Sequence, residues 1–172
     1  MIFMSQSGIT DSTRESGWDE WYVEHLRIMA SVPGISSAQR FKTTADAHPP
    51  SLAMYSVVSA DVFNDPYYLR VRGMGEWLSL IDRRYYRRNL FSGAERAPAV
   101  PQDRVLLVAD RSAPESGLGG IEWTWLESVA IDRSTPYRGI AVVDEAQAQT
   151  LDPSHAIAAY RPATACHTAA ST

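Results

Sequence analysis

The sequence predicts an α+β fold: a ferredoxin-like split β-α-β unit with an antiparallel sheet, followed by a β-rich C-terminal extension. Apolar residues recur at helical spacing from Trp18 to Met29, and β-prone runs lie on both sides of that segment. The first elements follow the order strand, helix, strand, strand, helix, strand, which places two helices on one face of a sheet. The other face then needs a cover, and a second sheet is the expected one.

The first strand is expected at residues 2–8, IFMSQSG. A helix follows from residue 18 and ends near Ser31. Pro33 removes a backbone donor there, and Gly34 tolerates the left-handed geometry in which helices often end.

The second and third strands are expected at residues 35–42 and 51–60, because both runs are rich in β-prone residues. A second helix is expected from about residue 65. Asn64 or Asp65 caps it, and Pro66 occupies a first-turn position where its missing donor is harmless.

After an interruption at RGMG, the spacing of Trp77, Ile81 and Tyr85 predicts that the helix resumes through GEWLSLIDRRYYRRNLF. The basic run RRYYRR at residues 83–88 is interpreted as a solvated helix end rather than an anion site, because its arginines spread around the helix. The apolar run RVLLVAD at residues 104–110 is predicted to be the fourth strand.

The remaining chain is predicted to be mostly β. WTWLESVAI and YRGIAVVDE, separated by DRSTP, indicate a hairpin, followed by a short helix at AQAQTL and a strand at AIAAYRP. Counting RVLLVAD as shared, this part is similar to a second split unit without its first helix. The predicted organisation is therefore a unit at 1–111, an extension or partial second unit at 112–162 and a flexible tail at 163–172.

Composition excludes several classes of protein. The 172 residues are 45% hydrophobic and 21% charged, as in folded globular proteins, and the net charge of -4 argues against nucleic acid as the main partner. No apolar run is long enough for a membrane span, and no basic leader precedes the first strand, so no membrane partner and a cytoplasmic location are expected. RGMG and SGLGG lack a dinucleotide fingerprint, so no nucleotide cofactor is expected.

His25 projects from the same helix face as the core residues, three or four positions from Trp21 and Met29. Two interpretations remain open. The imidazole either makes a hydrogen bond within the core or edges a pocket and moves a proton, which suits its usual pKa near 6.5.

No metal is expected, because the other histidines do not fall at ligand spacing. They are His48, His155 and His167. The single cysteine, Cys166, cannot form an internal disulfide.

The stretch W-x-x-WYVEHL-x-x-M-x-x-VPGI-x-x-AQRF, with SLAMYSVVSADVF and DPYYLRVRG, resembles EthD-like proteins of the dimeric α/β-barrel superfamily over residues 1–111. The resemblance implies two ferredoxin-like units paired sheet to sheet, in a homodimer or in a single-chain pseudo-dimer. It also implies a pocket for an aromatic, polyketide-like or lactone metabolite, and cofactor-independent chemistry of the cyclase, isomerase, decarboxylase or aldol type.

The resulting hypothesis makes His25 the general acid or base and Tyr55 the donor to a developing oxyanion. Trp21, Tyr22 and Trp77 would line the cavity, unless they only pack the core. Arg40 would orient a carboxylate or enolate, unless it is a surface residue on a strand edge. The alternative is a non-catalytic metabolite-binding or accessory protein that associates through its sheet.

Overall fold

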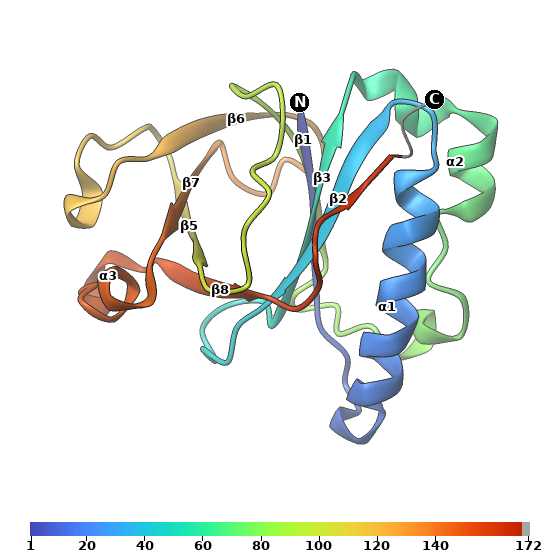
Figure 1. Ribbon diagram of the computed structural model, residues 1–172, viewed down its shortest axis with the longest axis horizontal. Coiled ribbons are helices and arrows are strands. Elements are labelled where there is room, and N and C mark those ends of the chain that lie inside the picture. The colour runs from blue at the N-terminus through green and yellow to red at the C-terminus, as the bar shows by residue number, and fades with distance from the viewer. Residues whose placement is uncertain (170–172) are drawn as a thin grey trace.

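One antiparallel sheet closes on itself to form a β-barrel, and the helices lie on its outside (Figure 1). The computed structural model describes residues 1–169. Its strands are β1 (Ile2–Ser7), β2 (Ile35–Lys42), β3 (Ser51–Val57), β4 (Arg87–Ser92), β5 (Val105–Arg111), β6 (Thr124–Ile131), β7 (Tyr137–Val143), β8 (Ala158–Pro162) and β9 (His167–Thr168). Its helices are α1 (Glu15–Ala30), α2 (Pro66–Val71) and α3 (Glu145–Gln149), with short 3-10 turns that include η3 (Gly75–Leu80).

The predicted ferredoxin-like sheet, and with it the dimeric α/β-barrel arrangement, is wrong. The strands are hydrogen-bonded in the order β3-β1-β4-β6-β7-β5-β8-β2, and pairing of β2 with β3 closes an eight-stranded ring. Strands of the second half join both edges of the first half, with β6 pairing to β4 and β8 pairing to β2. Closure leaves no free edge in the ring, and the C-terminal strands therefore complete the barrel instead of forming a separate covering sheet.

The helix predicted through GEWLSLIDRRYYRRNLF is also wrong. The segment forms the short turn η3 and then strand β4, which pairs with β1 on one side and with β6 on the other. The run RVLLVAD is a strand, but it is β5 of the second half and not the fourth strand of the first.

Three other predicted elements form at the residues where caps, helix-ending residues and β-prone runs predicted them. Helix α1 ends at Ala30, just before Pro33 and Gly34, and Gly34 has a φ of 87°. The Asp65 carboxylate caps α2 by accepting hydrogen bonds from the backbone N–H groups of Tyr67 and Tyr68, at 2.8 and 3.0 Å. The predicted late hairpin is β6 with β7.

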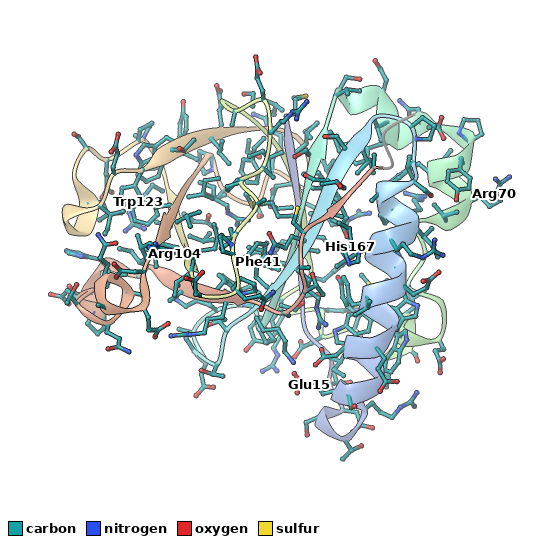
Figure 2. The ribbon with its side chains drawn as sticks, in the orientation of Figure 1. Glu15, Phe41, Arg70, Arg104, Trp123 and His167 are labelled. Atoms are coloured by element: carbon teal, nitrogen blue, oxygen red, sulfur yellow. The ribbon has the colours of Figure 1, made fainter. Side chains whose placement is uncertain are left out.

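Alternation along each strand separates two interiors. On β1, Ile2 and Met4 face the barrel lumen, while Phe3 faces α1. The lumen is packed with apolar side chains, Phe41 among them (Figure 2), as expected for a ring of eight strands. Trp123 belongs to a third cluster, on the outer face of β5 and β7.

Helix α1 lies along the outer face of β2 and its neighbours (Figure 1). Its buried face consists of Trp18, Tyr22, Leu26, Met29 and Ala30. These residues recur every three or four positions, so a single stripe of the helix packs on the sheet.

The end of the chain returns to β2. Strand β9 pairs with β2 through Ser37↔Thr168 and Ala38↔His167. Residues 163–169 of the predicted tail are thus described, and residues 170–172 lie outside the described part. Within residues 1–169, none of the helices combines the length and apolarity that a membrane crossing requires.

Candidate functional site

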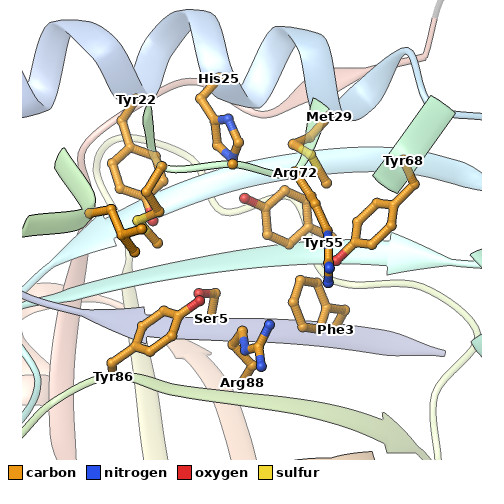
Figure 3. Close-up of a pocket in the computed structure, with 13 residues that line it drawn as sticks. Phe3, Ser5, Tyr22, His25, Met29, Tyr55, Tyr68, Arg72, Tyr86 and Arg88 are labelled. Carbon is orange, nitrogen blue, oxygen red and sulfur yellow. The ribbon is translucent and has the colours of Figure 1, made fainter. Parts of the chain in front are cut away.

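A cavity of about 310 Å³ lies between α1 and the outer face of β1, β3 and β4, with the end of α2 at its rim (Figure 3). Its walls combine aromatic, polar and cationic side chains. They are Phe3, Ser5, Tyr22, His25, Met29, Tyr55, Tyr68, Arg72, Gly73, Met74, Leu78, Tyr86 and Arg88.

Helix and strand periodicity bring the central residues together. Tyr22, His25 and Met29 lie three and four residues apart on α1 and therefore face the sheet in one row. Across the cavity, Phe3 of β1 is paired in register with Tyr55 of β3, and both point outward from the barrel.

His25 points from α1 into the cavity (Figure 3). Its ring stacks on Trp21, with 4.4 Å between centroids and 15° between planes, and meets Tyr22 edge-on at 5.9 Å. No group in residues 1–169 forms a hydrogen bond with its ring nitrogens, so the core hydrogen bond considered from the sequence is not found there. Burial lowers the pKa of His25 to about 4, and the imidazole is therefore neutral at pH 7.

Tyr55 lines the same cavity and is drawn with its hydroxyl on the side of α1 (Figure 3). Its side chain is only 2% exposed and stacks on Phe3 at 5.4 Å. Burial, reinforced by neighbouring tyrosines, raises the pKa of Tyr55 well above its usual value. The hydroxyl therefore stays protonated, and within the described residues it has no hydrogen-bond acceptor of its own.

Two arginines line the same cavity. Arg72 follows the last turn of α2 and has no carboxylate partner in the described part of the chain. Arg88 lies on β4; its backbone N–H donates to Asp132 Oδ2 at 2.7 Å, but its Nη2 is 3.7 Å from Asp132 Oδ1. The Nε of Arg88 is buried and has no hydrogen-bond partner in residues 1–169.

The basic run RRYYRR therefore does not end a helix, as the sequence indicated. Because residues alternate along an extended chain, Tyr86 and Arg88 face the cavity, while Tyr85 and Arg87 lie at the end of the barrel with Gln6 and Tyr160. Residues 83–85 of the run form a turn, and strand β4 begins only at Arg87.

The cavity unites three of the residues predicted for the site: Tyr22, His25 and Tyr55. Trp21 supports the His25 ring from outside the lining. The polar lining residues that were not predicted are Ser5, Tyr68, Arg72, Tyr86 and Arg88, which come from β1, from β4 and the residue before it, and from α2 and its end.

Arg40 and Trp77 lie elsewhere. Arg40 is 1% exposed and donates from Nη1 to Asp19 at 2.7 Å and from Nε to Ser51 Oγ at 2.9 Å. Its guanidinium lies over the ring of Tyr22, 4.2 Å from the centroid, so it fixes α1 to β2. Trp77 is buried against Trp18 at 5.3 Å and closes the core below the cavity.

No group of three or more His, Cys, Asp or Glu side chains in residues 1–169 could hold a metal ion. No protein-family model, curated protein or solved structure matches the chain. The chemistry of the site therefore has to be argued from its own side chains.

In one partly aromatic cavity, His25 can act as a neutral base, Tyr55 can donate a hydrogen bond from its protonated hydroxyl, and Arg72 and Arg88 supply two positive charges. A neutral imidazole can take a proton from carbon or oxygen, and a protonated tyrosine can donate to the oxygen on which negative charge develops. The aromatic part of the lining suits a ligand that carries a ring.

Proposed function

We propose that the protein is a small enzyme that moves a proton on an aromatic metabolite through its own side chains. His25 takes the proton from a carbon next to a carbonyl group, and the electrons of that C–H bond pass to the carbonyl oxygen as an enolate. Tyr55 donates a hydrogen bond to that oxygen. Return of the proton to another atom completes an isomerisation, and attack of the enolate carbon on a carbonyl carbon gives cyclase or aldol-type chemistry. A decarboxylase would reach the same enolate by loss of carbon dioxide, with the C–C bond electrons passing to the carbonyl oxygen and a proton then added to the carbon.

The observation that carries the proposal is the neutral, unpaired imidazole of His25 facing a protonated Tyr55 across one cavity. Neither the ring nitrogens of His25 nor the hydroxyl of Tyr55 has a hydrogen-bond partner among the described residues, so both groups are free to bond to a ligand in the cavity. Proton transfer would create an imidazolium and an enolate side by side, and the two charges stabilise each other away from water.

Hydrogen–deuterium exchange at carbon tests this proposal. Aromatic ketones and lactones are incubated with the protein in D2O, and loss of the acidic C–H signal is followed by NMR. We expect His25→Gln to slow the exchange about 100-fold or more and Tyr55→Phe to slow it about 100-fold. His48→Gln is the matched control, because His48 lies outside the cavity. Unchanged exchange in His25→Gln would contradict the assignment.

The second candidate is a binding protein without catalysis. It is favoured by one observation: a pKa of about 4 makes His25 a weak base near neutral pH. Such a protein would be stabilised by an aromatic ligand in a thermal-shift assay and would show no exchange at carbon. In that case His25→Gln would bind the ligand as well as the wild type does.

A further inference from the structure

The cation-rich end of the cavity carries a second inference, which rests on the proposed function and narrows its substrate. Arg72 comes from α2 and Arg88 from β4, two elements that converge only in the folded chain. In Figure 3 the Arg72 side chain extends past Tyr68 toward Phe3, and the Arg88 side chain rises from β4 between Tyr86 and Phe3. Both guanidinium groups are close enough to the Tyr68 hydroxyl to lower its pKa against the larger effect of burial, which raises it.

This end of the cavity has an uncompensated positive charge. Asp132 is the carboxylate nearest to Arg88, at 3.7 Å, and Arg72 has no carboxylate partner in residues 1–169. Two guanidiniums and one carboxylate leave about one positive charge, and His25 adds none because it is neutral at pH 7. Like charges facing one cavity repel each other, and a bound monoanion would remove that repulsion.

The donors also suit a carboxylate in geometry. Arginine presents planar N–H groups that match the two oxygens of a carboxylate. The Nε of Arg88 is buried and has no hydrogen-bond partner among the described residues, and Arg88 as a whole lines the cavity. The Tyr68 hydroxyl can add a further hydrogen bond from α2.

The rest of the cavity selects an aromatic body of limited size. Phe3 and Tyr55 provide stacked rings, and Leu78, which is 69% exposed, adds an apolar edge at the mouth. A volume of about 310 Å³ is roughly twice the 150 Å³ or so that accommodates benzene in a buried apolar cavity. A ligand of one or two rings fits, and an extended polycyclic one does not.

We propose that the substrate is an aromatic carboxylate of one or two rings. Its carboxylate is held by Arg72 and Arg88, and its reacting carbon lies at the opposite end, beside His25 and Tyr55. The two arginines orient the ring so that the C–H bond faces the imidazole.

Paired probes that differ only in charge test this proposal. The affinities of 2-naphthoate and 2-naphthamide for the full-length protein are measured by titration calorimetry at low and at physiological salt. We expect the carboxylate to bind at least tenfold tighter than the amide, with a preference that weakens as salt screens the charges. Arg88→Gln should reduce carboxylate affinity at least tenfold and leave amide affinity unchanged.

Arg87→Gln is the matched control, because Arg87 is next to Arg88 on β4 but lies at the barrel end. Arg72→Gln is the second test variant. Arg72 is exposed at the end of α2, so its loss should weaken carboxylate binding without unfolding the chain.

Equal affinity for the two probes, or equal losses in Arg87→Gln and Arg88→Gln, would overturn the carboxylate assignment. Failure of both probes to bind would overturn it as well. The proposed function is judged separately, by His25-dependent exchange in ketones and lactones that carry no carboxylate. If exchange at carbon depends on His25 but the carboxylate and the amide bind equally well, the proposed enzymatic function stands and only the carboxylate substrate is rejected.

Discussion

Strand β1 separates two interiors that treat buried polar groups differently. On the lumen side, Arg138 is fully buried and donates from Nε and Nη2 to the two carboxylate oxygens of Asp110, at 2.7 and 2.8 Å. Its Nη2 also donates to Gln6 at 2.8 Å, and its guanidinium lies 5.2 Å from the ring centroid of Phe91. The charge inside the barrel has a nearly complete set of partners.

The space beneath α1 is less completely paired. In the described residues, the buried atoms without a hydrogen-bond partner on this side are Ser7 Oγ, Arg40 Nη2, Trp77 Nε1 and Arg88 Nε, and of these residues only Arg88 lines the cavity. Ser128 Oγ, whose residue pairs with the lumen residue Phe91, is also unpaired. An unpaired buried polar group costs roughly 1 to 3 kcal/mol. The lumen is therefore the better-paired structural core around its buried charge, while at the cavity beneath α1 the unpaired Arg88 is where a ligand would supply a partner.

The largest expected effect tests the lumen. Asp110→Ala leaves the buried Arg138 guanidinium without its carboxylate. Because the Asp110 side chain is 45% exposed and water can replace part of it, the free energy of unfolding should fall by about 3 kcal/mol, at the low end for a buried pair. Urea denaturation at pH 7 measures it. Ligand binding beneath α1 should be unchanged in any fraction that stays folded.

A double variant is the control. Asp110→Ala combined with Arg138→Met removes the charge and keeps an apolar side chain, so it should recover much of the lost stability. A loss below about 1 kcal/mol in the single variant would mean that the Arg138–Asp110 pair does not hold the lumen together.

The segment from Trp18 to Lys42 could be predicted from sequence because its signals are local. Apolar spacing, the Pro33–Gly34 stop and β-prone residues all lie within the segment itself. Strand β4 could not be predicted in the same way. Its pairing partners, β1 and β6, lie far away in the chain, and the spacing of Trp77, Ile81 and Tyr85 imitates a helix.

The residues of the candidate site could likewise be predicted only where the signal is local. Helical spacing placed Tyr22 and His25 on one face. The direction of Tyr55 was open, because every residue of β3 is buried and such a strand has no polar alternation to mark its faces. Arg88 was missed because its position depends on β4 being a strand.

The next effect in size tests the unpaired His25. Its pKa is about 4 in the folded protein and about 6.5 in the unfolded chain. As pH falls below 6.5, the unfolded chain takes up a proton that the folded protein does not, so stability is lost between pH 6.5 and 4. Between pH 7 and 4.5 this loss amounts to about 2.5 kcal/mol.

Denaturation curves of wild type and His25→Gln at both pH values isolate the contribution of His25, because all carboxylates are common to the two proteins. We expect the wild type to lose about 2.5 kcal/mol more than the variant over this range. An equal loss of stability in the wild type and in His25→Gln would show that protonated His25 has a partner in the folded protein. His25 would then be no less completely paired than the polar groups of the lumen.

The smallest effect tests Arg40, the buried arginine beneath α1. Partial burial would raise the pKa of the Asp19 carboxyl, but Lys42 and Arg40 outweigh it and lower that pKa. Asp19→Ala removes this acceptor, while Arg40 keeps Ser51 and the ring of Tyr22. Because the Asp19 side chain is 41% exposed and water can replace part of it, we expect a loss of only about 2 kcal/mol.

Glu15→Ala is the control, because Glu15 contacts Lys42 at 2.6 Å and should change the free energy of unfolding by about 1 kcal/mol at most. The decisive comparison is between the two aspartates. If Asp19→Ala destabilises the protein as much as Asp110→Ala does, the ring of Tyr22 contributes little to holding Arg40. The buried arginines of the lumen and of the space beneath α1 would then depend on their carboxylates to the same degree. The unpaired polar groups around the cavity would in that case no longer indicate ligand binding.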